Sequence, residues 1–402
     1  MSKGINDIQP ARLEQALAAR GFTKGQLATL VGVAASTVTK WCKGDQAPEA
    51  EKFERLASVL NVQAEWLTRP TLKPITAPLY RSNAAALKAA RNKLEARAEW
   101  AQEMAVLLSE YVEYPQLKLP ERSFEDPEQI GKVDIEAAAE ECRALWQLGR
   151  GPIHNLTLAA ESAGIIVVRE ETEVSAIEGL SSWSELLQRP IVFLSADKAN
   201  AFRSRFDLAH EIGHLILHKH IPRATERERH NQMERQAHMF ASALLLPAEA
   251  FSSEVRLPPN LDNLLILKQR WGVSVAAMMM RLHVLGFLSD DEKLSLFKRR
   301  SARWGAKAEP YDDKWDIELP RLMRRTVELL INEGVLAAED FSRFLGVSSQ
   351  DIEKLCSLRE NYFASPAEIV ELATLRSSRV DAVKVPKRGE RGTVLSFLGY
   401  KK

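Results

Sequence analysis

The chain has 402 residues, which is enough for two or three domains. Its formal net charge is +1, so it is not basic throughout, and any surface for nucleic acid must be local. The three cysteines lie far apart and no apolar run reaches the length of a membrane span, so we expect a cytoplasmic protein without a membrane partner.

Near the N-terminus, apolar residues recur at helical spacing between glycine breaks, which predicts a compact set of short helices. Thr23 and Gln26 have the spacing of a capping box and predict the start of a helix. Gly32 supplies a tight turn before the segment AASTVTKWCKG. A helix, a short turn containing glycine and a second helix make up the helix-turn-helix design.

The second of these helices is expected to face DNA, with its first residues at base edges in the major groove. The segment resembles the XRE family of phage-repressor-like DNA-binding domains over about residues 10–68. By position, the base-reading slots of that family fall on Ala35, Ser36 and Lys40, and Lys24 and Lys43 would lie near phosphates. The full set of expected DNA-contacting residues is Lys24, Ala35, Ser36, Thr37, Thr39, Lys40 and Lys43.

Two positions depart from the family pattern. Ala34 stands where Ser or Thr usually caps the reading helix, and Ala35 replaces a common amide reader, so specificity would rest on fewer contacts. Domains of this kind bind as dimers on two half-sites, so we expect a homodimer on double-stranded operator DNA. A helical bundle used for protein contacts is the alternative.

Proline-rich and β-rich segments follow this module. Three prolines in residues 68–78 (TRPTLKPITAP) predict a linker, and residues 84–113 have the pattern of a long amphipathic helix. Short β-rich runs at 165–168 and 190–194 predict a small sheet. We expect the stretch RPIVFLSA, which contains the second run, to form an edge strand where an extended substrate could pair.

Histidine is concentrated in one region, because six of the eight histidines fall between residues 210 and 238. His210 and His214 belong to the motif HEIGH and lie four residues apart, so on a helix both imidazoles can face one ion. Glu211 lies beside them, where it can hold a metal-bound water. Two histidines satisfied in a core without metal are the alternative.

A catalytic zinc needs a third protein ligand and one open position. Downstream carboxylates include Glu226, Glu228 and Glu234. The segment MERQAHMFASALLLP has the pattern of an amphipathic helix, on which Glu234 and His238 share a face. Glu234 could ligate the metal while His238 supports a ligand.

The stretches RFDLAHEIGH and ERQAHMFASALLLP together resemble the ImmA/IrrE family of zinc metallopeptidases, over about residues 140–285. The resemblance implies a zincin-like fold in which His210, His214 and Glu234 hold Zn²⁺ and Glu211 is the catalytic base. Asp207 stands where Thr is common in that family, and His238 where Asn or Asp is common. Neither departure removes a ligand or the base.

This residue set predicts hydrolysis of peptide bonds. Zinc would lower the pKa of a bound water, and Glu211 would take its proton and pass it to the leaving amine. His218, which is in phase with His214, and His238 are candidates to support a ligand or to donate to the oxyanion; His220 is another oxyanion candidate. A structural role for His218 is the alternative.

We therefore expect a mainly α (α+β) protein: a five-helix helix-turn-helix domain, a zincin-like domain with a small sheet, and a helical C-terminal region. Its expected function is a DNA-binding transcriptional regulator with a conditional zinc endopeptidase, which cleaves a repressor-like protein in a stress or mobile-element response, or cleaves itself in the linker. The expected regions are 1–70 (helix-turn-helix), 71–130 (linker and helical region), 131–290 (peptidase) and 291–402 (helical, regulatory).

Two alternatives stay open for the second half of the chain. In one, the peptidase-like domain is a non-catalytic sensor; in the other, it is a partner-binding module of the toxin–antitoxin type. The stretch DFSRFLGVSSQDIEKL also has a helix-turn-helix rhythm around Gly346. We expect it to belong to a regulatory or oligomerising tail, with a second DNA reader as the alternative.

Overall fold

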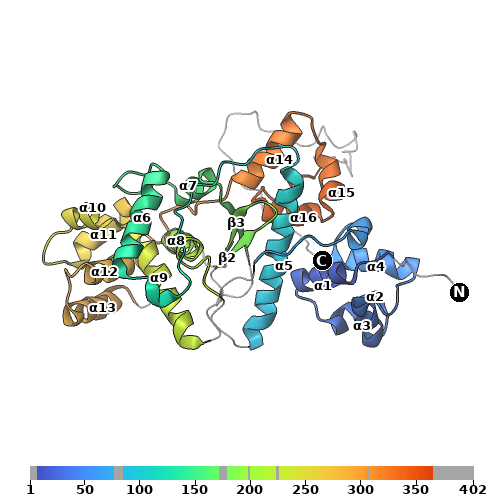
Figure 1. Cartoon of the computed structure of the whole chain (residues 1–402), viewed down its shortest axis with the longest axis horizontal. Coiled ribbons are helices and arrows are strands. Elements are labelled where there is room, and N and C mark those ends of the chain that lie inside the picture. Colours follow the sequence, from blue (N-terminus) through green and yellow to red (C-terminus); the bar gives the residue numbers. More distant parts are fainter. Residues whose placement is uncertain are drawn as a thin grey trace, which may run out of the picture. The chain divides into compact units, whose positions relative to one another are not determined.

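The computed structural model describes residues 7–76, 85–171, 179–197, 200–222, 226–305 and 308–364. These residues form sixteen α-helices and one three-stranded sheet, which confirms the mainly α, α+β class (Figure 1). Residues 365–402 of the expected regulatory region lie outside the described residues.

The N-terminal domain forms as the helical pattern predicts. The side chain of Thr23 accepts from the backbone of Gln26 in a complete capping box. Gly32 ends the helix in the left-handed region, with φ of 74°, so the turn needs glycine there. The helices are α1 (Pro10–Arg20), α2 (Lys24–Val31), α3 (Ala35–Lys43), α4 (Ala50–Leu60) and the 3₁₀ helix η1 (Ala64–Thr68).

The long amphipathic helix is α5 (Ala85–Leu108), and it joins the N-terminal domain to the rest of the fold. Arg12 of α1 donates to the Glu103 carboxylate of α5 at 2.5 and 2.9 Å, and both side chains are buried. The indole of Trp66 donates to the same carboxylate. Apolar residues of α1 to α5 share one core with part of the sheet.

The sheet has the order β1-β3-β2, with β1 parallel and β2 antiparallel to the central strand. The expectation of an edge strand at RPIVFLSA is therefore wrong, because β3 is paired on both sides. Its residues 190–194 are all buried, as in a strand covered on both faces. The strands are β1 (Ile166–Glu170), β2 (Gly179–Ser184) and β3 (Arg189–Ser195).

β2 is one of the two edge strands of this sheet, and its sequence GLSSWS contains three serines and a glycine and lacks the apolar run that marks a strand. It forms because the antiparallel ladder with β3 satisfies its backbone, and because Leu180 lies in the core. One face of β2 lies against α8, the helix that carries the histidines.

Helices cover the sheet and build a second core around α8 and α9. The segment with the HEIGH motif is α8, and the ERQAH segment lies in α9, which packs on α8 and on α6 (Figure 1). The helices of this part are α6 (Lys132–Leu145), α7 (Leu156–Ser162), α8 (Ala201–Leu217), α9 (Arg227–Leu245), α10 (Ala248–Glu254), α11 (Leu261–Trp271), α12 (Val275–Val284) and α13 (Asp290–Trp304), with the 3₁₀ helix η2 (Pro127–Gln129).

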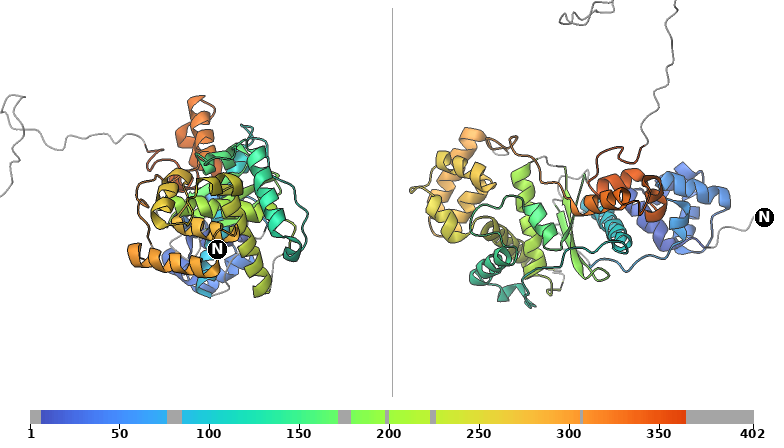
Figure 2. Two further views of the ribbon diagram at one scale, coloured as in Figure 1. Left: turned by 90° about the vertical axis from the view of Figure 1, so that its left-hand side faces the viewer. Right: turned by 90° about the horizontal axis from the view of Figure 1, so that it is seen from above.

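After α13, the chain returns towards the N-terminal domain, and its last helices contact α5 and β1 (Figure 2). Val347 forms a β-bridge with Val62, and the backbone of Gln63 donates to Gly346. Residues distant in sequence thus share the core that holds the N-terminal domain. These elements are α14 (Leu322–Asn332), η3 (Ala338–Asp340), α15 (Phe341–Leu345) and α16 (Ser349–Leu355).

Candidate metal centre

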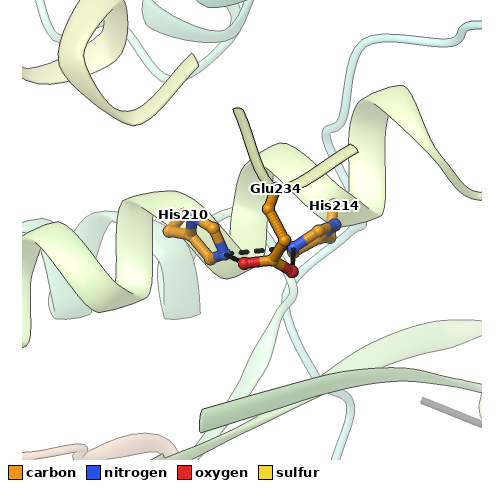
Figure 3. A group of neighbouring side chains, drawn as sticks. All are labelled: His210, His214 and Glu234. Carbon is orange, nitrogen blue, oxygen red and sulfur yellow. Dashed lines mark hydrogen bonds and ion pairs between the residues drawn. The ribbon is translucent and has the colours of Figure 1, made fainter. Parts of the chain in front are cut away.

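Two neighbouring helices bring the expected metal ligands together. His210 and His214 come from α8, one turn apart, and Glu234 comes from α9 (Figure 3). The two Nε2 atoms are 3.0 Å apart, and they lie 3.5 and 3.3 Å from the Glu234 carboxylate oxygens. All three ligand atoms lie within 4.8 Å of one another.

These distances fit a metal ion of the size of zinc. Tetrahedral ligands at the usual Zn–N and Zn–O lengths are about 3.3 Å apart, close to the separations seen here. Two imidazole nitrogens and one carboxylate are also donors that zinc prefers. His210, His214 and Glu234 could therefore hold the ion and leave one position open.

The charges of these three side chains favour a cation between them. Burial alone would raise the pKa of Glu234, but hydrogen bonds from His210 and His214 hold it far below its ordinary value. Burial lowers the pKa of His210, yet its hydrogen bond to Glu234 and the nearby carboxylates raise it above the ordinary value. The carboxylate is thus ionised and can receive a cation.

A hydrogen-bonded chain orients His214. Gln236 donates from Nε2 to the carbonyls of Pro127 and Ile130, at 2.7 and 3.1 Å, so its Oε1 is left to accept. The Nε2 atom of His218 donates to that oxygen at 3.1 Å, and its Nδ1 lies 2.9 Å from Nδ1 of His214.

The hydrogen bonds from Gln236 through His218 to His214 fix which ring nitrogens of the two histidines carry protons. Desolvation of the buried ring lowers the pKa of His218 well below its ordinary value, so the ring is neutral and carries a single N–H. That N–H donates to Gln236, so Nδ1 of His218 accepts from Nδ1 of His214. Nδ1 of His214 is therefore the donor to His218, and its Nε2 is the ring nitrogen that faces the cluster and can ligate a metal.

Glu211 lies beside the cluster on α8 and is 8% exposed. Its Oε2 is buried and accepts no hydrogen bond from the described residues. A buried carboxylate oxygen without a partner is costly, unless water or substrate supplies a donor. A β-carbon on Gly179 would lie 3.3 Å from the other oxygen, Oε1, so β2 borders this carboxylate at its glycine.

Two more histidines lie on the face of α9 that carries Glu234. His230 Nε2 is 3.9 Å from Glu234, one turn before it, and His238 Nδ1 lies 2.7 Å from the Glu234 carbonyl. The ring of His238 packs edge-on against His210, with centroids 4.4 Å apart. The sequence reading missed His230, although its four-residue spacing from Glu234 could have indicated it.

The two other oxyanion candidates occupy different environments. His218 is 2% exposed and uses both ring nitrogens in the hydrogen-bonded chain described above, so it has no N–H to offer a substrate. His220 is exposed and lies beyond the end of α8. His238 is exposed beside His210, at the rim of the cluster.

The expected DNA-reading helix is α3, and its polar side faces outward. It begins at Ala34 without a side-chain cap, and Val38 and Trp41 are buried beneath it. Lys24 is engaged, because its Nζ donates to Glu14 at 3.2 Å. Of the other expected contact residues, the exposed ones are Ala35, Ser36, Lys40 and Lys43, and the half-buried ones are Thr37 and Thr39.

The C-terminal pair α15 and α16 repeats the helix-turn-helix geometry with a different surface. Gly346 takes a left-handed φ of 79°, and Ser348 caps α16. Asp351 and Glu353 are buried, at the start of the helix where a DNA reader would be exposed. Arg20 and Arg97 bind Asp351, so this face packs inside the protein.

Both predicted domains match known protein families. Residues 13–67 match the helix-turn-helix family, and residues 160–283 match the family of the IrrE N-terminal-like domain. A comparison with curated proteins gave no match. The chain thus joins a DNA-binding helix-turn-helix domain to a metallopeptidase-like domain, as the resemblance implied. Within the part of the chain that the structure describes, no helix combines the length and apolar character needed to cross a membrane.

Proposed function

We propose that this protein is a DNA-binding regulator whose second domain is a zinc-dependent endopeptidase. The observation that carries the proposal is the convergence of His210, His214 and Glu234 beside Glu211, whose Oε2 has no hydrogen-bond donor among the described residues. A purely structural cluster would give a buried carboxylate its own hydrogen-bond donor. In Glu211, Oε2 is left able to accept from a water molecule or a substrate.

In the proposed reaction, a zinc ion held by His210, His214 and Glu234 would supply Lewis acidity that lowers the pKa of a water and polarises the scissile carbonyl. Glu211 accepts the proton from that water at Oε2 and delivers it to the leaving amine nitrogen. His218 and Gln236 keep His214 in the tautomer that binds metal. His238, exposed at the rim beside His210, is the donor that we assign to the developing oxyanion; because its Nδ1–H is directed at the Glu234 carbonyl, it would donate from Nε2 as the protonated imidazole.

The substrate binds in extended form along β2 in this proposal. β2 is one of the two edge strands of the sheet, and Gly179 at its start lies beside Glu211. An extended chain can pair with such an edge through backbone hydrogen bonds and bring its peptide bond to the metal. The strand that we expected for this role, β3, has no free edge.

We further propose that the helix-turn-helix domain binds operator DNA as a homodimer and that the peptidase cleaves a repressor-like protein in a stress or mobile-element response. The exposed polar side of α3 supports the first part, because a reading helix must reach base edges. The same fused domains are compatible with a non-catalytic sensor, in which zinc is bound and no protein is cleaved.

Metal analysis of the purified full-length chain tests the site. We expect one zinc per chain in the wild type and in Glu211→Gln, and loss of zinc in His210→Ala and in Glu234→Ala. The matched control is His220→Ala, which removes an exposed histidine close to the same helix. Wild-type protein without zinc would contradict the proposal.

Comparative proteomics tests the reaction. Cells with the wild-type protein and cells with Glu211→Gln are treated with a DNA-damaging agent, and their repressor-like proteins are quantified. We expect at least one of them to disappear only in wild-type cells. If zinc is bound and the two proteomes agree, the domain is a sensor.

A further inference from the structure

Part of the linker between the two domains lies on the outer edge of β2. The backbone N–H of Thr76 donates to the carbonyl of Trp183 at 3.1 Å, and the N–H of Trp183 donates to Thr76 Oγ1 at 2.9 Å. The Ser182 hydroxyl donates to the Thr76 carbonyl. The Trp183 end of the edge is therefore already paired, by the chain itself.

The linker runs antiparallel to β2. Lys73 pairs with Glu185, and Thr76, three residues later, contacts Ser182 and Trp183. Rising residue numbers in the linker thus match falling numbers in β2. The segment points towards Gly179, which lies about 13 Å from Trp183 at the usual strand rise and borders Glu211.

Both domains hold this segment in place. Ile75 is 8% exposed and belongs to the core that includes α5, and Gln102 of α5 donates to the Lys73 carbonyl at 2.9 Å. Just upstream, Arg12 of α1 donates to the carbonyls of Arg69 and Pro70. The path from the DNA-reader domain to the β2 edge is therefore fixed at successive points.

We infer that residues 73–76 act as an internal strand that occupies part of the substrate-pairing edge and so restrains the peptidase. This inference rests on the proposed function, because it concerns access to the same edge. An extended substrate must displace Thr76 before it can pair with Trp183. Since Arg12 of the DNA-reader domain fixes the start of this segment, a rearrangement of that domain would change the availability of the edge.

The linker is also the segment in which we expect self-cleavage. Residues 77 and 78 lie outside the described residues; of residues 71–76, Ile75 is buried, Leu72 is half-buried and the other four are exposed. Residues 73–76 lie near the Trp183 end of β2, away from Glu211, so they serve as a competing strand. Their own peptide bonds are not placed at the metal ligands.

A binding experiment tests the restraint without requiring hydrolysis. All variants carry Glu211→Gln, and the probe is a fluorescein-labelled peptide of the sequence PTLKPIT, which copies residues 70–76. Thr76→Pro removes the N–H that donates to Trp183, and we expect the peptide to bind it about tenfold more tightly than the parent. Thr71→Pro is the matched control, because it places proline in an exposed part of the same linker.

Hydrogen exchange provides a second measurement. In Thr76→Pro, we expect the Trp183 amide to exchange faster and to become protected again when the peptide binds. Thr76→Val keeps the backbone donor and should give an intermediate affinity. Equal peptide affinity in Thr76→Pro and Thr71→Pro, with unchanged exchange at Trp183, would overturn the inference.

The two proposals fail separately. Tighter peptide binding in Thr76→Pro, together with a wild-type protein that cleaves nothing, would contradict the peptidase and leave the internal strand in place. Cleavage of a cellular protein by the wild type, together with unchanged peptide binding, would contradict only the internal strand.

Discussion

Gly213 of α8 packs so closely on Phe240 of α9 that a β-carbon at the glycine would lie 3.1 Å from Phe240 Cδ1 and 3.2 Å from the Cα of Ala237. The second contact is with backbone, so no rotamer change can relieve it. The glycine precedes His214, and the close approach of the two helices lets Glu234 reach the histidines. The candidate metal centre thus depends on glycine at position 213, because any side chain there would separate α8 from α9.

Gly213→Val should push α9 away from α8. We expect the free energy of unfolding to fall by about 1–3 kcal/mol, as in other overpacked cores, and the affinity for zinc to fall with it. Thermal unfolding and chelator competition measure the two effects. Gly25→Val is the control, because the nearest side-chain atom to its β-carbon position is 4.0 Å away. Equal effects of both variants would contradict this account.

Gln236→Leu should weaken zinc binding although Gln236 is not a ligand. The change removes the acceptor of the His218 N–H, so His218 no longer fixes the tautomer of His214. Loss of such supporting partners lowers metal affinity about 10–100-fold, and competition with a chromogenic chelator measures it. Exposed His220→Ala should leave the affinity unchanged. An unchanged zinc affinity in Gln236→Leu would show that the hydrogen bonds from Gln236 through His218 do not orient His214.

Asp351→Asn should destabilise the junction of the N-terminal and C-terminal helices. Asp351 pairs with Arg97 at 2.6 Å and with Arg20 at 2.5 Å, and its side chain is 5% exposed. Removing one partner from a buried ion pair costs about 3–5 kcal/mol, and we expect a loss near the lower figure at pH 7. Urea unfolding measures it, and exposed Asp340→Asn should change the stability by less than about 0.5 kcal/mol.

The effect of Asp351→Asn should also depend on pH. Burial alone would raise the pKa of Asp351, but hydrogen bonding from Arg20 and the charge of Arg97 lower it below its ordinary value of 3.8. A depressed carboxyl pKa stabilises the folded protein fully above the unfolded pKa, and this contribution is lost as the pH falls through the folded pKa. The stability difference between the two proteins should therefore shrink below about pH 4. A stability difference that does not change with pH would contradict an ionised Asp351 paired with Arg20 and Arg97.

Lys40→Ala should weaken DNA binding, whereas Lys354→Ala should not. Each lysine lies eight residues after the turn glycine of its helix pair and is exposed. Only α3 combines its lysine with an open polar surface, because Asp351 and Glu353 are buried in α16. Fluorescence anisotropy with a duplex selected from random sequences measures the affinity. If Lys40 also contacts a phosphate, its loss should make the slope of log affinity against log salt concentration shallower by about one unit.

The sequence by itself determined those features that depend on neighbours along the chain. The capping box at Thr23, the uncapped start of α3 and the left-handed turn at Gly32 all follow from local backbone chemistry. The four-residue spacing of His210 and His214 likewise places two imidazoles on one helical face. Such features hold wherever the helix lies in the fold, which is why they could be predicted.

The tertiary structure decided which distant groups meet. β2 could not be predicted because GLSSWS lacks an apolar run, and it becomes the edge strand only through its ladder with β3. The acceptor role of Gln236 depends on carbonyls more than a hundred residues away, and the pairing of Thr76 with Trp183 joins residues equally distant. The physical reason is that hydrogen bonds and burial between remote segments are absent from any local pattern, so only the assembled fold specifies them.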